Sequence, residues 1–321
     1  MTRHLSEPFF NWLQSSSGRC LLEKISEYSS LSIGMAGNSL KIYFQGGLIL
    51  SIPSEIAINE KMKLKPLSPA YHKGKAETNL AEIIKEGVTL SNLQKYLDCV
   101  IGVLSRRVNL RQEEQTRQEI AYINNRSRIA NDTDYFIVDQ EYSVVTNKTS
   151  KFDLVAIKWP SISEVRKRFS LSDIEIVVFE LKFGLNAVGG TKKETGKADL
   201  KCHIEDFNSL KADLDNFQKF KRDIIRMFIQ QSNLEGFYNP KIGGLKNVKR
   251  LLGSKSVEEI AENINVKFGF ILADYKQESS RLKEQINMFT DDFLFARSSF
   301  MGYGLYENEM LTRKDLEEKL K

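Results

Sequence analysis

The sequence has few of the residues on which several large classes of protein depend. It contains three cysteines and three histidines among 321 residues, and neither the cysteines nor the histidines lie close to one another. This spacing excludes a zinc site built from ligand pairs. No apolar run approaches the roughly 18 residues of a membrane helix, and residues 1–25 lack the hydrophobic segment of a signal peptide. We therefore expect a reduced, cytoplasmic protein that has no membrane contact.

The common nucleotide-binding and hydrolase motifs are also absent from the sequence. It contains no GxxxxGK[ST] loop, no GxGxxG after a predicted strand and no GxSxG. A small-molecule enzyme of these classes is thus disfavoured. What is present is an ordinary globular composition, with 41% hydrophobic and 28% charged residues. Such a chain can bury a sizeable core.

Positive charge is concentrated in the middle of the chain. The net charge is +5, but residues 182–255 hold 15 Lys or Arg against 8 Asp or Glu. The last 66 residues, 256–321, hold 9 Lys or Arg against 13 Asp or Glu. The middle segment would suit a polyanionic partner, although a solvated lysine-rich surface would have the same composition.

Hydrophobic periodicity predicts a mixed α/β chain. We expect helices at 9–13, 21–28, 91–106, 112–125, 199–226 and 277–288, and strands at 135–145, 152–159, 174–183, 266–274 and 293–298. Residues 40–52 read as a hairpin around Gly46 and Gly47, and residues 61–75 as a connection or lid. The apolar run at 174–183 is typical of a strand buried on both faces.

The fold class that follows is α/β, with a central mixed sheet flanked by helices (an α+β mixed sheet). Its centre reads helix, strand, strand, strand, helix, strand, and the three successive strands form a meander. We predict an N-terminal α+β extension at 1–75, a main domain at 76–310 and a helical tail at 311–321.

Three charged residues in apolar strands require a chemical explanation. Glu180 and Lys182 share a face near the end of the strand at 174–183, and Asp153 is the lone carboxylate of FDLVAI. If the strands are adjacent, these residues converge and could hold Mg²⁺ through the two carboxylates, with the Leu181 carbonyl as a third ligand. Such a metal lowers the pKa of bound water beside a scissile phosphate. A salt-bridged strand end is the simpler alternative, and Asp274-Tyr275-Lys276 is a second motif of this kind.

The order of elements and these residues resemble the PD-(D/E)XK nuclease superfamily, which has the restriction-endonuclease-like fold. Asp153 would be the motif aspartate, and Glu180-Leu181-Lys182 the E-x-K. The resemblance is closer to uncharacterised bacterial members and covers about residues 111–298. Phe152 replaces the motif proline, and a basic insertion lengthens the gap between Asp153 and Glu180.

Several further residues are candidates to support the site. The resemblance implies a glutamate from the first core helix, and the candidates for this catalytic role are Glu114, Gln118 and Glu119. Glu141, His203 and Asp206 are candidates for contacts with a phosphate or with Lys182. The lysines that follow the motif strand could bind the phosphate backbone, namely Lys192, Lys193, Lys197 and Lys201. Each of these residues could equally belong to an ordinary solvated surface.

The resemblance implies a Mg²⁺-dependent nuclease that uses Mn²⁺ as a substitute and hydrolyses DNA with a metal-activated water, leaving a 5′-phosphate. A homodimer would suit cleavage of both strands. Two alternatives remain, a non-catalytic nucleic-acid-binding module on the same fold and a protein-interaction module. Metal-dependent cleavage and salt-sensitive DNA binding distinguish the three.

Overall fold

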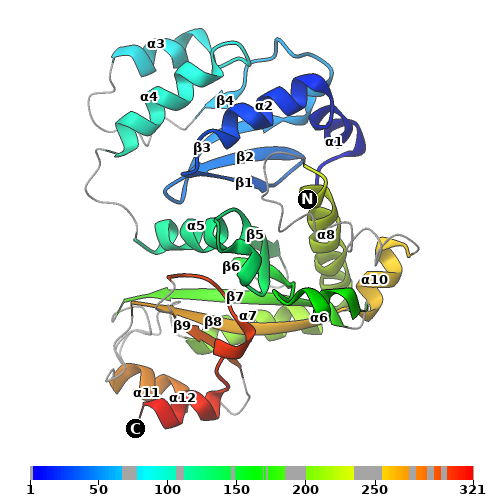
Figure 1. Ribbon diagram of the computed structural model, residues 1–321, viewed down its shortest axis with the longest axis vertical. Helices are drawn as coiled ribbons and strands as arrows, with labels where there is room; N and C mark the ends of the chain where they lie inside the picture. The colour runs from blue at the N-terminus through cyan, green and yellow to red at the C-terminus, as the bar shows by residue number, and fades with distance from the viewer. Residues whose placement is uncertain are drawn as a thin grey trace. The chain divides into compact units, whose positions relative to one another are not determined.

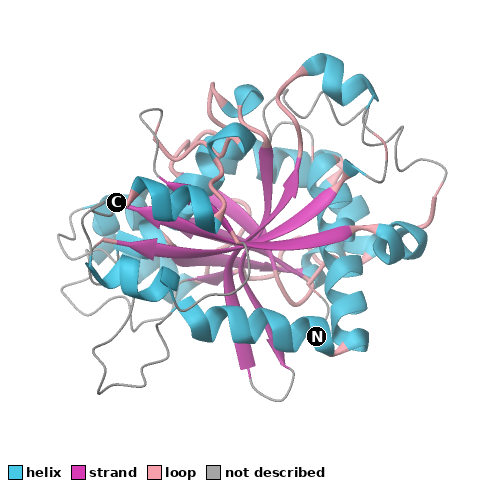
Figure 2. Ribbon diagram, turned by 90° about the horizontal axis from the view of Figure 1, so that it is seen from below, coloured by secondary structure: helices cyan, strands magenta, loops and turns pink. Residues whose placement is uncertain are grey.

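The computed structural model describes residues 3–66, 78–105, 112–145, 149–168, 170, 173–184, 200–234, 255–274, 280–287, 293–297 and 302–320, and Figure 2 colours these by secondary structure. The chain divides into two compact units. The first comprises Met1–Gln118 and Ile229–Asn239, and the second comprises Glu119–Phe228 and Pro240–Lys321. These boundaries fall within two helices, α5 (Gln112–Asn125) and α8 (Leu214–Ser232), whereas the sequence suggested a boundary at residue 75.

The N-terminal unit is built on an antiparallel sheet of four strands in the order β1-β2-β3-β4. The strands are β1 (Leu31–Met35), β2 (Ser39–Phe44), β3 (Gly47–Pro53) and β4 (Lys65–Pro66). Helices α1 (Glu7–Leu13), α2 (Ser16–Ser26), α3 (Thr78–Glu86) and α4 (Leu93–Ser105) complete it, with a 3₁₀ turn η1 (Ser54–Ala57). The predicted hairpin is confirmed as β2–β3, and Gly46 in its turn has a φ of +77°, a conformation that glycine adopts without steric cost.

The second unit contains a five-stranded mixed sheet in the order β5-β6-β7-β8-β9. Strands β5 (Tyr135–Val145), β6 (Thr149–Lys158) and β7 (Glu175–Phe183) form the predicted antiparallel meander. Strands β8 (Asn265–Ala273) and β9 (Leu294–Arg297) then add in parallel to β7. The remaining elements are η3 (Ala130–Asp132), α6 (Ser163–Arg168), α7 (Leu200–Ala212), α10 (Val257–Asn263), α11 (Ser280–Asn287), η6 (Glu307–Glu309) and α12 (Arg313–Lys319) (Figure 1).

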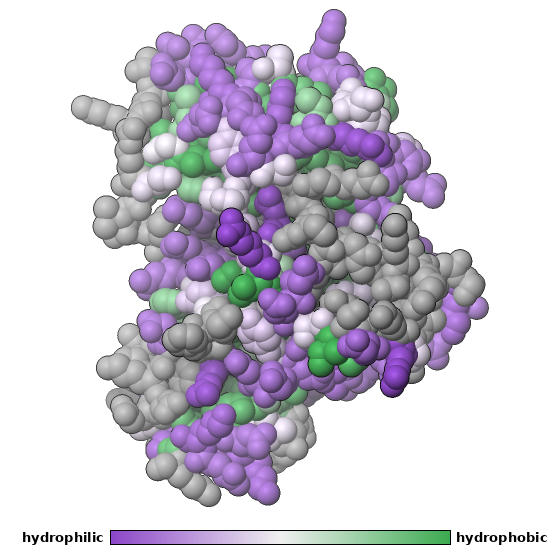
Figure 3. All heavy atoms as spheres, in the orientation of Figure 1, coloured by the Kyte–Doolittle hydropathy of each residue, from purple (hydrophilic) through white to green (hydrophobic). Residues whose placement is uncertain are grey.

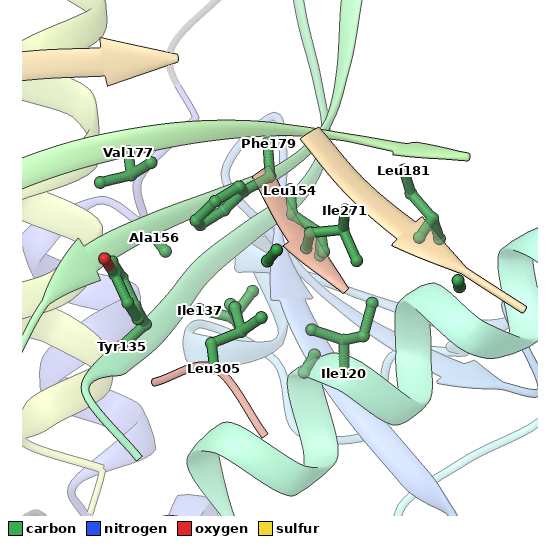
Figure 4. Close-up of a cluster of buried hydrophobic side chains, with 13 residues drawn as sticks. Ile120, Tyr135, Ile137, Leu154, Ala156, Val177, Phe179, Leu181, Ile271 and Leu305 are labelled. Carbon is green, nitrogen blue, oxygen red and sulfur yellow. The ribbon is translucent and has the colours of Figure 1, made fainter. Parts of the chain in front are cut away.

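One hydrophobic cluster of the second unit, referred to below as the α5-side cluster, lies on one face of this sheet. Alternate residues of β6 and β7 supply Leu154, Val177, Phe179 and Leu181, while α5 supplies Ile120. Figure 4 shows these side chains pointing toward one another from the strands and the helix. Strand residues of the opposite parity, including Glu180 and Lys182, therefore point to the other face.

Two elements differ from the sequence-based prediction. The helix expected at 199–226 is interrupted at Asp213 and forms α7 and α8. The Asp213 carboxylate accepts a hydrogen bond from the backbone N–H of Asn216, which caps the new helix and ends the continuous one. The short helix α6 lies in a segment that was expected to be an irregular basic interruption.

The exposed surface is mainly polar where Figure 3 views the molecule. Hydrophilic atoms cover α11 and α12, and a small hydrophobic area lies beside α6, where Ile162 and Val165 are 58% and 43% exposed. None of the helices among the described residues combines the length and the apolar character needed to span a bilayer.

Candidate functional site

The two predicted carboxylates lie on neighbouring strands of the five-stranded sheet. The register pairs Leu154 of β6 with Phe179 of β7, and the next antiparallel position places Asp153 opposite Glu180. Both side chains are buried, with 8% of Asp153 and 4% of Glu180 exposed. The meander therefore brings together two residues that are 27 positions apart in sequence.

Asp153 is fixed by the backbone of the partner strand. The N–H of Leu181 donates to Oδ2 of Asp153 at 2.9 Å, in a buried hydrogen bond. The backbone pairing of β6 with β7 ends one residue earlier, at Leu154 and Phe179. A carboxylate thus binds the backbone where the ladder between the two strands ends, directly beside Glu180.

Lys182 completes a closed group of three side chains. Its Nζ lies 2.9 Å from Oε1 of Glu180 and 2.9 Å from Nε2 of His203 on α7. The His203 Nε2 and the Glu180 Oε1 are 3.0 Å apart. An ammonium group can only donate, so a charged Lys182 donates to the carboxylate. Nε2 of His203 is within hydrogen-bond distance of both partners, and it accepts from Lys182 or donates to Glu180 according to which ring nitrogen carries the hydrogen.

The face that holds this group is the one opposite the α5-side cluster, and buried apolar residues such as Val178 and Phe270 line it as well. Helix α7 covers it through His203, whereas α5 packs Ile120 into the α5-side cluster on the other side of the sheet. Figure 1 shows α5 and α7 on opposite sides of β7. Lys182, 6% exposed, is held between a strand and α7.

The donor set fits a hard divalent cation. Mg²⁺ in proteins is commonly held by one or two carboxylates together with water, and Asp153 and Glu180 provide two. The described residues contain no group of three or more His, Cys, Asp or Glu that could hold a metal. Within the described ranges, the main-chain oxygen of Leu181 is the further ligand that the sequence suggested.

The helical candidates of α5 are not brought to this group. The Gln118 amide lies in the N-terminal unit, where it accepts a hydrogen bond from Gly46 N–H and donates to the carbonyls of Ser30 and Tyr43. Glu114 packs against Gly46 in the same unit. Glu119 is exposed on α5, where desolvation raises the pKa of its carboxyl. We leave all three out of the proposed site.

The other supporting candidates have different surroundings. Glu141 has a φ of +57° and forms an ion pair with Lys151 at 2.6 Å. Asp206 lies one turn after His203 on α7 and is partly buried. Lys201 is exposed and lies 3.9 Å from Glu205 of the same helix. Three predicted lysines lie outside the described residues, namely Lys192, Lys193 and Lys197.

The second E/D-x-K candidate is placed differently from the first. Asp274 directly follows β8 and has a φ of +50°, while Tyr275 and Lys276 lie outside the described residues. Tyr303, which lies between Gly302 and Gly304, packs against the α5-side cluster.

Comparison with known proteins gives no relative from which to assign this site: no protein-family model, curated protein or solved structure matches the chain.

Proposed function

We propose that the chain is a divalent-metal-dependent nuclease that hydrolyses phosphodiester bonds of DNA at Asp153, Glu180 and Lys182. The observation that carries this proposal is the convergence of two buried carboxylates and a buried ammonium on one face of β6 and β7. Burying charged groups costs free energy, and a buried ion pair is often no more stabilising than apolar residues of the same volume. A chemical role accounts for retaining all three groups.

The topology of the second unit supports the proposal. Helix α5 is followed by the antiparallel meander β5-β6-β7, then by α7 and the parallel strand β8. This is the order of elements on which the resemblance to the PD-(D/E)XK superfamily rests. The aspartate and the E-x-K pair occupy the second and third strands of that order.

Each residue has a distinct role in the proposed reaction. Asp153 and Glu180 would hold Mg²⁺ or Mn²⁺, and the ion, when bound, supplies positive charge at the phosphate and makes water more acidic. Lys182 presents an ammonium that stabilises negative charge developing on the phosphoryl oxygens. Nε2 of His203 contacts both Nζ of Lys182 and Oε1 of Glu180, and this contact restricts the direction of the ammonium.

The proposal is tested by measuring cleavage of supercoiled plasmid and of single-stranded DNA, each with Mg²⁺, Mn²⁺ or EDTA. We expect metal-dependent cleavage that Asp153→Asn and Glu180→Gln each reduce by at least about a hundredfold, because each removes a ligand charge. The matched control is Glu175→Gln on the same strand, since Glu175 pairs with Lys267 at 2.7 Å at the opposite end of β7. This control should cut normally.

Two results would contradict the proposal. Normal cutting by both ligand variants would place the chemistry elsewhere. Tight, salt-sensitive DNA binding by a wild-type chain that never cuts would instead favour a non-catalytic binding module, and neither binding nor cutting would favour a protein-interaction module.

A further inference from the structure

One row of residues crosses all four strands of the N-terminal sheet. The register pairs Gly34 with Lys41, Lys41 with Ser51, and Ser51 with Lys65. Residues directly opposite each other in antiparallel strands project their side chains from the same face. Nζ of Lys41 donates to Oγ of Ser51 at 2.7 Å. Two lysines therefore flank one serine hydroxyl on a single sheet face.

Within the part of the chain that the structure describes, the two lysines have no carboxylate paired with them. Lys41 is partly buried, and both this burial and the charge of Lys65 lower the pKa of Lys41. Like charges held together on a partly desolvated surface repel each other, so the row is short of an anion.

The neighbouring positions supply further hydroxyl groups. Gly34, opposite Lys41, has no side chain, and the Tyr43 ring occupies the space beside it, 3.1 Å from the point that a Cβ would take. Ser32, opposite Tyr43 on β1, is 6% exposed, and its Oγ has no hydrogen-bond partner among the described residues. Hydroxyl and ammonium groups are the donors from which an anion accepts hydrogen bonds.

We propose that Lys41, Ser51 and Lys65 form a binding site for a phosphate group, carried either by a nucleic-acid backbone or by a free phosphate compound. The two ammonium groups supply the charge, and the Ser51 hydroxyl donates to the anion while it accepts from Lys41. A bound phosphate offsets the repulsion between the lysines. The site goes beyond the proposed nuclease function, because it uses neither a metal nor any residue of β6 and β7.

Calorimetric titration of the full chain with inorganic phosphate tests the site, in EDTA and at ionic strength held constant with chloride. We expect Lys41→Met and Lys65→Gln each to weaken phosphate binding about tenfold, the cost of one charged hydrogen bond. Lys61→Gln is the matched control, since Lys61 is an exposed lysine of the same unit outside the sheet. This control should bind phosphate like the wild type.

A short DNA oligonucleotide, titrated under the same conditions, identifies the source of the phosphate. DNA affinity that falls in the two lysine variants assigns the site to a nucleic-acid backbone, whereas unchanged DNA affinity assigns it to a free phosphate compound. Wild-type phosphate affinity in both variants, or no phosphate binding by the wild type, overturns the proposal. Lys65 is exposed, so Lys65→Gln keeps the test valid if Lys41→Met unfolds. These titrations do not measure cleavage, so the proposed phosphate site can still be confirmed if the nuclease proposal fails.

Discussion

At the scale of single residues, the second unit is distinguished by the buried charges of Glu180 and Lys182. They are two residues apart on one strand, so their side chains lie on the same face. They form an ion pair in which Nζ of Lys182 lies 2.9 Å from Oε1 of Glu180. His203 adds a second polar contact from a different element, with its Nε2 2.9 Å from Nζ of Lys182. A lysine held by two polar partners loses the rotational freedom of its long side chain, which is what a positioned electrostatic group requires.

Substitution of His203 measures the value of that second contact. If the site cleaves DNA as proposed, His203→Leu should reduce the cleavage rate about tenfold, because one hydrogen bond to a charged group is lost. His203→Gln keeps an acceptor oxygen and should recover much of the rate. The measurement is the single-turnover rate of both variants, with circular dichroism to check the fold. Equal losses in the two variants would mean that His203 acts only by filling space.

At the scale of elements, the packing of β8 between β7 and β9 depends on a residue without a side chain. Gly269 pairs with Phe179 on one side and with Leu294 on the other. A Cβ at this position would lie 2.8 Å from the Leu294 carbonyl oxygen and 3.0 Å from the Phe179 ring. Both distances are shorter than van der Waals contact, and the nearer one involves backbone that cannot move freely.

Gly269→Ala should therefore lower the free energy of unfolding by about 1–3 kcal/mol, the usual cost of overpacking. Gly102→Ala is the opposite case, since Gly102 lies inside α4 and a Cβ there would meet nothing within 4 Å. It should stabilise the protein by about 0.5–1 kcal/mol, because alanine loses less backbone entropy in a helix. Urea denaturation measures both changes. A neutral Gly269→Ala would show that β9 can shift to accept the methyl group.

The junction between α7 and α8 depends on Asp213, whose carboxylate accepts from the backbone and the side chain of Asn216. These hydrogen bonds lower its pKa below the ordinary 3.8. The stabilisation is therefore fully present above pH 3.8 and is lost as the pH falls through the lowered folded-state pKa.

Asp213→Ala should lower the thermal denaturation midpoint at neutral pH, and the difference from the wild type should shrink below pH 3.8. Asp213→Asn keeps an acceptor that does not titrate, so it should retain the cap at every pH. Denaturation midpoints of the three proteins from pH 7 to pH 2.5 provide the measurement. A difference that persists unchanged in acid would assign the effect of Asp213→Ala to helix propensity.

At the scale of the whole molecule, the chain contains two sheets, each in its own compact unit. Phe179 is fully buried in the second unit, where its ring meets that of Tyr135 edge to face, with centroids 5.7 Å apart. Leu31 is fully buried on β1 of the N-terminal unit. Units with separate cores commonly open separately.

Phe179→Ala should cost about 3–5 kcal/mol and should speed amide hydrogen exchange in β5–β8 more than in β1–β3. Leu31→Ala should show the reverse pattern. Exchange measured by mass spectrometry on the full chain distinguishes the two sheets. A uniform increase across both sheets in either variant would show that the two units open together.

Local patterns in the sequence were sufficient to define many of the elements. The helix at 112–125 and the strand at 135–145 have the predicted bounds, and the buried run at 174–183 forms β7. The period of the hydrophobic pattern and its apolar content determine these elements, because both are properties of residues that are neighbours in the sequence. The interruption at Asp213 was missed because a capping side chain inside a helical pattern changes neither of these features.

The sequence by itself determined a mixed α/β chain and the residue types that could perform metal-assisted chemistry. Only the tertiary structure decided which of them meet. It placed Asp153 beside Glu180, brought His203 to Lys182, and put α5 with Glu119 on the opposite face of the sheet. The same holds for Lys41 and Lys65, which are 24 positions apart in sequence but share one row of the sheet. Strand register and helix placement depend on long-range packing, which a local pattern does not contain.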